Sequence, residues 1–309
     1  MTFTANVKEE LAHVSATCSH CERAMLAGIL RIEGTLFVGG KNKHRLEVAI
    51  DAPSVARTTI QMLHNLYGIK TSLTLRRSVL HKTTNYLIEC PAQKKLSEAL
   101  LDLGVLTHEG SLVLGVAPHL VAKQCCTAAY LRGVFLGSGF IANPSGNFHF
   151  EIVVETQNLA DDIAHLLHQN QIDAKVVQRR SSYKVYLKNG DAILRFLALC
   201  GAHKAALEME NARVIKSVRS AVNRQTNAEV ANQAKASRAS LNQLNTIRTV
   251  LQAYGMKNLS PALQDFIKLR VAHPEATLKE LGALAKPPLS KSAVNHRVRR
   301  LEEMAAKVT

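Results

Sequence analysis

One nine-residue block occurs twice in the chain, and its second copy begins 105 positions after the first. The first copy reads LAGILRIEG at residues 26–34, and the second reads LRGVFLGSG at residues 131–139. Glycines stand at matching places in the two copies, Gly28 with Gly133 and Gly34 with Gly139. A glycine inside a helix lets another backbone approach closely, and a glycine at its end favours termination. The repeat therefore predicts two similar helices that pack backbone against backbone and then end abruptly.

The same order of predicted elements follows each copy of the block. Two strands joined by a turn come first, then an amphipathic helix, two more strands and a closing helix. In the first half these are strands at 35–38 and 46–50 around a turn at 39–42, a helix at 55–66, strands at 69–75 and 86–88, and a helix at 93–103. In the second half they are strands at 140–141 and 148–154 around a turn at 143–147, a helix including 163–167, strands at 174–177 and 183–187, and a helix at 192–200. Both halves thus have the order αββαββα.

The paired blocks resemble the LAGLIDADG helices of homing endonucleases. In that family two such helices cross at a pseudo-two-fold axis, and an acidic residue before each final glycine holds the metal ions at the scissile phosphates. Here the first copy keeps an acid, Glu33, but the second has Ser138. A neutral hydroxyl cannot replace a carboxylate in a two-metal phosphodiesterase site. The resemblance implies a nuclease scaffold without nuclease chemistry, and a residual homing endonuclease stays as an alternative.

Positive charge is concentrated in the last third of the chain. The formal net charge is +15, and residues 201–309 contribute +10 of it, with 18 Lys and Arg against 8 Asp and Glu. Such a tail favours a polyanionic partner, and nucleic acid is the first candidate. Residues 1–14 contain Glu9 and Glu10 and no apolar core of a signal peptide, and no apolar run approaches the ~20 residues of a membrane span. We expect a cytoplasmic protein.

Six cysteines, at positions 18, 21, 90, 125, 126 and 200, lack the spacing of a disulfide framework. Cys18 and Cys21 could supply half of a zinc site together with nearby His13 or His20, but no second CxxC follows nearby. We expect the adjacent pair Cys125–Cys126 to point to opposite sides of any regular element. The prediction is therefore reduced thiols, with no metal and no cofactor.

Residues 260–303 contain three short helices with clear boundaries. The first begins at Ser260-Pro261, ends near Pro274 and has the apolar positions Leu263, Phe266, Ile267 and Leu269. The second opens with a capping-box sequence at 277–280 and has the apolar stripe Leu278, Leu281 and Leu284. The third is capped by Ser290 and directs Val294, Val298 and Leu301 inward. This spacing predicts a helix-turn-helix domain.

The outward face of the third helix is basic and carries an amide. Its candidate DNA-binding residues are Ser290, Lys291, Ser292, Asn295, His296, Arg299 and Arg300. In the major groove arginine pairs with guanine and asparagine with adenine, while cations at the flanks contact phosphates. We predict that this helix reads double-stranded DNA; a small basic domain that binds protein is the alternative.

Residues 205–255, between the repeat and the tail, have an almost entirely helical pattern. Val214, Val218 and Val222 form one apolar stripe, and arginines occupy other faces. We interpret this segment as a connector whose arginines lie on a solvated face rather than on DNA.

Several short sequence runs in the repeat and in the basic tail are typical of one protein family. They are CC at 125–126, AYLRG at 129–133, GAH at 201–203, NR at 223–224, LKELG at 278–282, PPLSKS at 287–292 and VNHR at 294–297. With them the chain resembles the WhiA family, bacterial DNA-binding regulators linked to cell division, chromosome segregation and, in sporulating actinobacteria, sporulation. Two positions depart from the family: Ala228, where a cysteine is usual, and Glu33, where many members are not acidic.

The resemblance implies an α+β fold in which a pseudo-two-fold LAGLIDADG homing-endonuclease-like domain is joined by a helical linker to an all-α helix-turn-helix domain. We place the two halves at 1–112 and 113–204, the connector at 205–255 and the helix-turn-helix domain at 256–309. The implied function is a non-enzymatic transcription factor of cell division and chromosome segregation, associated with the nucleoid. Double-stranded DNA is the expected partner, and RNA polymerase or another regulator docked on the basic tail is the alternative. No membrane and no small-molecule substrate are expected.

Overall fold

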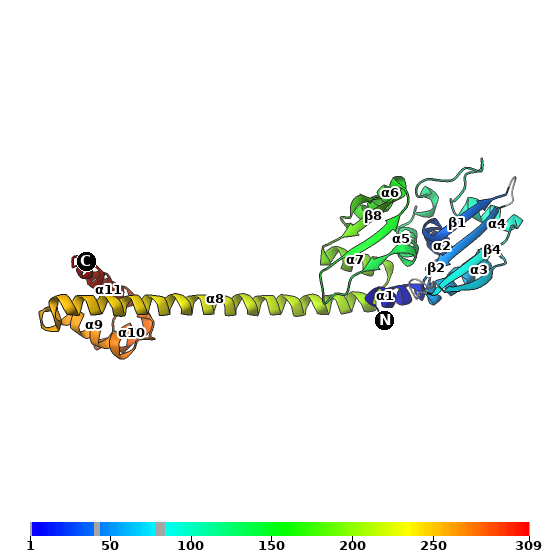
Figure 1. Cartoon of the computed structure of the whole chain (residues 1–309). Helices are drawn as coiled ribbons and strands as arrows, with labels where there is room; N and C mark the ends of the chain where they lie inside the picture. Colours follow the sequence, from blue (N-terminus) through cyan, green and yellow to red (C-terminus); the bar gives the residue numbers. More distant parts are fainter. Residues whose placement is uncertain (1, 40–43, 78–83, 309) are drawn as a thin grey trace. The chain divides into compact units, whose positions relative to one another are not determined.

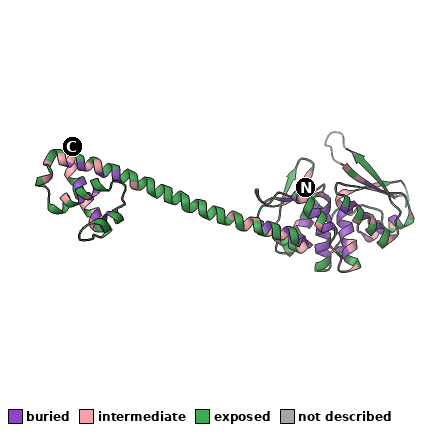
Figure 2. Ribbon diagram, turned by 90° about the horizontal axis from the view of Figure 1, so that it is seen from below, coloured by how far each residue is buried: buried purple, intermediate pink, exposed green. Residues whose placement is uncertain are grey.

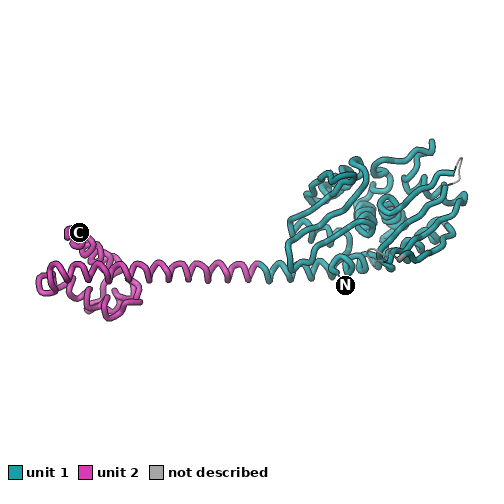
Figure 3. Tube along the Cα trace, in the orientation of Figure 1, with its two compact units in different colours: residues 1–216 teal, residues 217–309 magenta. Residues whose placement is uncertain are grey.

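The computed structural model describes residues 2–39, 44–77 and 84–308. Two compact units divide the chain, Met1–Lys216 and Ser217–Thr309 (Figure 3). Each unit has its own hydrophobic core and is described by itself.

The first unit contains the repeated order of elements that the sequence predicts (Figure 1). After α1 (Phe3–Ala12), the first half consists of α2 (Ser19–Glu33), β1 (Gly34–Val38), β2 (His44–Ile50), α3 (Pro53–Tyr67), β3 (Ser72–Arg77), β4 (Thr84–Cys90) and α4 (Lys94–Asp102). A short 3₁₀ turn, η1 (Pro118–Leu120), precedes the second half, which consists of α5 (Gln124–Ser138), β5 (Phe140–Ile141), β6 (Phe150–Val154), α6 (Gln157–Gln169), β7 (Lys175–Arg179), β8 (Ser182–Leu187) and α7 (Gly190–Cys200). The αββαββα order is confirmed in both halves; the predicted turn at 39–42 lies mostly outside the described residues.

Each half builds one four-stranded antiparallel sheet with the same strand order. The orders are β1-β2-β4-β3 and β5-β6-β8-β7. Burial alternates along β2, where Leu46, Val48 and Ile50 enter the core while the residues between them are more exposed. Alternation of this kind identifies a sheet with one face packed against helices.

Helices α2 and α5 pack against each other at the centre of the first unit, where Figure 2 shows most of the buried residues. Their approach depends on the repeated glycines. A Cβ on Gly133 would lie 2.0 Å from the Met25 carbonyl oxygen, and one on Gly28 would lie 2.5 Å from the Tyr130 carbonyl oxygen. The predicted backbone-to-backbone packing is therefore confirmed.

The glycines that end the repeated blocks terminate both helices, but in extended rather than left-handed backbone. Gly34 follows α2 with φ −86° and ψ 125°, and Gly139 follows α5 with φ −69° and ψ 142°. A Cβ on Gly139 would lie 2.5 Å from the Phe135 carbonyl oxygen. Steric space, and not a positive φ, is the reason for glycine here.

The second unit is all-helical. Helix α8 (His203–Tyr254) begins in the first unit, and its later part is followed by η2 (Met256–Asn258), α9 (Pro261–Ala272), α10 (Leu278–Leu284) and α11 (Lys291–Ala305). The core joins Phe266, Ile267 and Leu281 to the inward residues of α11. Two residues of α8, Ile247 and Val250, are fully part of this core. The end of the predicted connector is therefore a packed helix of the second unit.

Two apolar stripes that the sequence predicts, on α10 and α8, are partly or wholly exposed. Leu284 was placed on the inward stripe of the second short helix, but 47% of it is exposed. That expectation is wrong, because α10 ends at Leu284 and only Leu281 of the stripe is fully buried. The stripe on α8 lies on an exposed face, where Val214, Val218 and Val222 each keep more than half of their surface accessible. No helix in the described part of the chain is long and apolar enough to cross a membrane.

Candidate nucleic-acid interface

Side chains cap the N-termini of both helices of the predicted helix-turn-helix motif, α10 and α11. The Thr277 hydroxyl accepts a hydrogen bond from the Glu280 backbone N–H at 3.3 Å, and the Glu280 carboxylate accepts one from the Thr277 N–H at 2.7 Å. Hydrogen bonding of the Glu280 carboxylate to the Thr277 backbone N–H, and then to the Thr277 side chain, lowers the pKa of Glu280 below its ordinary value. The Ser290 hydroxyl accepts a hydrogen bond from the Ala293 N–H at 3.2 Å at the start of α11. Both predicted caps are confirmed.

The turn between α10 and α11 requires a glycine that the sequence analysis did not single out. The Leu289 N–H donates to the Gly282 carbonyl at 2.8 Å, and a Cβ on Gly282 would lie 2.3 Å from the Leu289 carbonyl oxygen. The chain entering α11 therefore crosses α10 at backbone contact distance. This contact fixes the angle at which α11 leaves the turn.

A buried arginine, also missed from the sequence, holds the loop between α9 and α10. Arg270 is 2% exposed, and its guanidinium donates a 2.6 Å hydrogen bond to the Ala276 carbonyl. Burial lowers the pKa of Arg270. A buried charge needs such partners, because desolvation without them is costly. Arg270 therefore supports the domain and is not part of its binding face.

The predicted DNA-binding residues lie on one side of α11 and at its start. Asn295 is half-buried, and the other candidates are exposed: Ser290, Lys291, Ser292, His296, Arg299 and Arg300. Asn295 and Arg299 are four residues apart, so their side chains occupy adjacent turns of one face. Ser290 is engaged as the helix cap, and Arg300 pairs with Glu303 at 3.1 Å. Among the remaining candidates, Lys291 lies at the helix start, and Asn295 and Arg299 share one face with Ser292 and His296.

Arg297 lies on a different side of α11 and lines an open cleft of about 600 Å³ beside α9. Asp265 and Lys268 of α9 contribute to the same cleft. Arg297 is two positions from both Asn295 and Arg299, so the helical rotation of about 100° per residue directs its side chain away from the face that they share. Arg297 is therefore left out of the candidate interface.

In the first unit, a buried lysine lies near Glu33, the acidic residue of the first repeated block. Lys8 of α1 is 5% exposed, and its ammonium nitrogen lies 2.8 Å from the Gly137 carbonyl oxygen and 3.2 Å from a carboxylate oxygen of Asp51. Glu33 lies close enough to Lys8, Asp51 and Glu155 for charge interaction. Burial raises the pKa of Glu33, Lys8 lowers it, and the two other carboxylates raise it. The positive charge near these three carboxylates is the ammonium group of Lys8.

Ser138, in the matching position of the second copy, faces the backbone of β6. Its hydroxyl donates to the Val153 carbonyl at 2.6 Å and accepts from the Val153 N–H at 3.2 Å. Both its donor and its acceptor capacity are thus used within the fold. The repeated helices therefore end differently: α2 ends with the carboxylate of Glu33, and α5 ends with the hydroxyl of Ser138, which is hydrogen-bonded to β6.

The expectation that Cys125 and Cys126 point to opposite sides is wrong. Their sulfur atoms lie, with those of Cys18 and Cys21, all within 4.8 Å of one another. In residues 2–39, 44–77 and 84–308 this is the sole group of at least three His, Cys, Asp or Glu side chains arranged closely enough to hold a metal ion. His13 and His20, which the sequence places near Cys18 and Cys21, are not members of this group.

Comparison with known protein families covers both units. The model of the WhiA N-terminal LAGLIDADG-like domain matches residues 19–106, that of the WhiA LAGLIDADG-like domain matches 127–219, and that of the WhiA C-terminal HTH domain matches 222–305. The chain belongs to the WhiA family. The resemblance drawn from the sequence is therefore confirmed.

Full-length relatives agree with this assignment. The chain is 39% identical to a protein of Desulforamulus reducens named "Probable cell division protein WhiA", over 100% of this chain and 96% of that protein. A protein of the same name from Heliobacterium modesticaldum is 38% identical, over 99% of this chain and 96% of that one. The fold also matches the crystal structure of full-length DUF199/WhiA from "Thermatoga maritima", with a TM-score of 0.62, 21% identity, and coverage of 100% of this chain and 99% of that one.

The predicted fold class is confirmed by these WhiA matches. A crystal structure of the N-terminal LAGLIDADG domain of DUF199/WhiA matches with a TM-score of 0.51 and 20% identity, covering 65% of this chain and 90% of that one. The α+β repeat domain and the all-α helix-turn-helix domain are thus both WhiA features of this chain.

Proposed function

We propose that this WhiA-family chain is a DNA-binding regulator without enzymatic activity. The observation that carries the proposal is the face of α11: Asn295 and Arg299 lie one turn apart, and Lys291 lies exposed at the helix start. A helix that enters the major groove places such side chains against base edges, and a cation at its N-terminus against a phosphate. The match to a helix-turn-helix family model supports the same role.

The absence of catalysis is part of the proposal. Glu33 and Ser138 supply a single carboxylate at the paired helix ends, and the Lys8 ammonium lies near that carboxylate. Hydrolysis of a phosphodiester by this type of scaffold needs cations held by carboxylates, and a lysine nitrogen cannot activate water as a bound metal does. The first unit is therefore proposed as a scaffold that contacts DNA or protein.

The biological role that we propose is based on the names of the relatives. Because those relatives are named as probable cell division proteins, we assign the chain to transcriptional regulation of cell division. The family resemblance extends this role to chromosome segregation, at the nucleoid in the cytoplasm, with double-stranded DNA as partner. We propose the division into residues 1–112, 113–204, 205–255 and 256–309; the boundary between the two compact units, at residues 216/217, falls inside the proposed connector.

The test begins by selecting duplexes bound by the full-length chain from a random library, since the target sequence is unknown. Binding of the selected duplex and of random duplex is then measured for Asn295→Ala and Arg299→Ala. Each substitution should weaken binding to the selected duplex by about 1–3 kcal/mol and change binding to random duplex much less. Arg248→Ala is the matched control, because Arg248 is an exposed arginine of the second unit on α8.

Two outcomes would contradict the proposal. Equal weakening of selected and random binding by the α11 variants would mean that α11 does not read sequence. Failure of the full-length chain to bind duplex at any salt concentration would reject DNA as the partner and favour docking of the basic tail on a protein such as RNA polymerase.

A further inference from the structure

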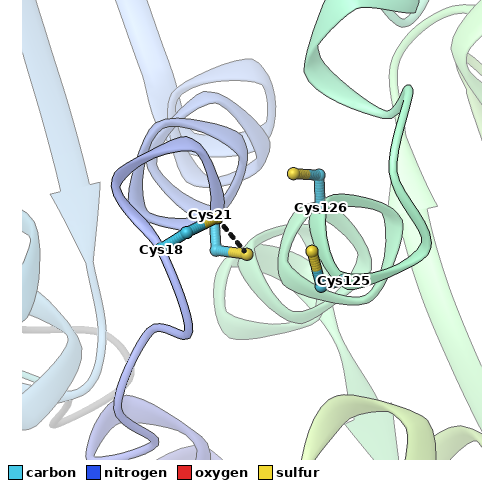
Figure 4. Close-up of side chains that lie close together, drawn as sticks. All are labelled: Cys18, Cys21, Cys125 and Cys126. Atoms are coloured by element: carbon cyan, nitrogen blue, oxygen red, sulfur yellow. Dashed lines mark hydrogen bonds between the residues drawn. The ribbon is translucent and has the colours of Figure 1, made fainter.

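Four cysteines from distant parts of the sequence meet where α2 and α5 begin. Cys18 and Cys21 lie at the start of α2, and Cys125 and Cys126 lie in the first turn of α5 (Figure 4). The sulfur atoms of all four are within 4.8 Å of one another, and those of Cys18 and Cys21 are 3.3 Å apart. Figure 4 shows the side chains converging on the space between the two helices.

These distances suit four ligands of one ion. Zinc binds thiolate sulfur at about 2.3 Å in a tetrahedron, which places sulfurs about 3.8 Å apart. The separation of the Cys18 and Cys21 sulfurs, 3.3 Å, is close to this value, and no pair among the four is farther apart than 4.8 Å. Soft thiolate ligands in a tetrahedral set select zinc over the hard cations Mg²⁺ and Ca²⁺. The spacing of Cys18 and Cys21 is that of the usual CxxC half of a structural zinc site.

Polar and cationic groups lie around two of the four sulfurs, those of Cys18 and Cys21. Neither α2 nor α5 has a side-chain cap at its N-terminus, so the positive ends of two helix dipoles face the sulfurs. The buried guanidinium of Arg132 lies close enough to Cys21 for charge interaction. Hydrogen bonds from Cys21 and His20 lower the pKa of Cys18 to about 6. The Thr17 hydroxyl, 3.2 Å from the Cys21 sulfur, adds a polar neighbour.

We propose that Cys18, Cys21, Cys125 and Cys126 bind one Zn²⁺ ion that ties the N-terminal end of α2 to that of α5. Each thiol that becomes a ligand releases its proton to solvent, and no oxidant or reductant takes part. Because a thiol must lose its proton to become a ligand, metal binding strengthens as pH rises. The ion is a structural centre: all four positions are filled by protein, which leaves none for substrate.

The position of the site explains what the ion does. Helices α2 and α5 already touch through Gly28 and Gly133, farther along each helix. A second attachment at their starts prevents the two helices from pivoting about the glycine contact. Because these helices connect the two halves, the ion stabilises the pairing of the halves and not either half alone.

The experiment uses the full-length chain, purified under reducing conditions without chelator. Metal content by plasma mass spectrometry should be about one zinc per chain. Replacement of zinc by Co²⁺ should give the intense visible absorption of a tetrahedral thiolate site. Cys18→Ala and Cys125→Ala should each weaken zinc binding by about 100-fold or more, because each removes one ligand. Cys125 is exposed, so its replacement leaves the core intact and circular dichroism can verify the fold.

Cys90→Ala and Cys200→Ala are the matched controls, since both cysteines are buried outside the cluster. They should retain full zinc content. The proposal is overturned if the reduced wild-type chain binds neither added zinc nor cobalt, if its native metal is iron, or if the Cys125→Ala variant keeps wild-type zinc affinity. A disulfide between Cys18 and Cys21 in protein isolated from the native cytoplasm would also overturn it, because a bridged pair cannot supply two thiolates.

Discussion

The ammonium nitrogen of Lys8 lies 2.8 Å from the carbonyl oxygen of Gly137, the residue that precedes Ser138 at the end of α5. A residue of the N-terminal helix thus reaches the end of a repeated helix in the second half. The same nitrogen pairs with Asp51, which follows β2 of the first half. Lys8 therefore joins the two halves near the C-terminal end of α5.

The first prediction is that the chain does not cleave DNA. With Mg²⁺ or Mn²⁺, supercoiled plasmid should remain uncut by the purified chain, because Ser138 removes one carboxylate and Lys8 places a cation near the other. Agarose electrophoresis measures the outcome. Cleavage that disappears in Glu33→Gln would show that the ancestral chemistry survives.

The second prediction concerns pH and Glu33. The pKa of this carboxyl is raised in the folded protein, mainly by burial, so the folded state prefers the protonated form. Folding stability from this group is therefore highest below the unfolded pKa of about 4.3 and falls as pH rises through the raised folded value. Glu33→Gln should raise the urea midpoint at pH 7 relative to wild type, and the difference should vanish near pH 4. A lower midpoint at pH 7 would mean that the ionised carboxylate and Lys8 stabilise the fold.

The third prediction tests the helix crossing. Gly133→Ala should destabilise the first unit by about 3 kcal/mol or more, because the added Cβ meets the backbone of Met25 and a backbone cannot rotate away. Urea unfolding followed by circular dichroism gives the loss. Gly146→Ala is the control, since its Cβ would meet only the Asn143 carbonyl at the ordinary distance of 3.5 Å. Equal stability of the two variants would remove the glycines from the explanation of the fold.

The fourth prediction separates phosphate contacts from base reading. Lys291→Ala should weaken binding to selected and random duplex by the same factor and lower the slope of log affinity against log salt by about 1. Fluorescence anisotropy across a salt series measures both quantities. Lys257→Ala, at an exposed lysine in η2, should leave the slope unchanged. A loss confined to the selected duplex would instead make Lys291 a base-reading residue.

The sequence predicted what depends on local pattern. The glycine repeat predicted the crossing of α2 and α5, and strand alternation predicted the order of elements in both halves. Caps at Thr277 and Ser290 were predicted correctly because each requires only residues three positions apart. The role of the α11 face in DNA binding stays a prediction.

Contacts between distant segments could not be predicted in this way. Cys21 and Cys125 are far apart in the chain, and only the packing of α2 on α5 brings their first turns together. The burial of Lys8 could not be predicted from the sequence either, because a lone lysine in a helix is normally a surface residue. Ile247 and Val250 belong to a long polar helix, and their burial depends on where α9 and α11 pack.

The hydrogen bonds of Ser138 restrict which side chain can stand at this position. An aspartate at this position would bring a carboxylate, which only accepts hydrogen bonds, against the Val153 carbonyl that now receives the serine proton. That single replacement would lose a bond and introduce repulsion, while Lys8 would still lie beside Glu33. A second carboxylate at the ends of the repeated helices would thus need changes on separate elements, and the replacement of Ser138 alone would destabilise the fold.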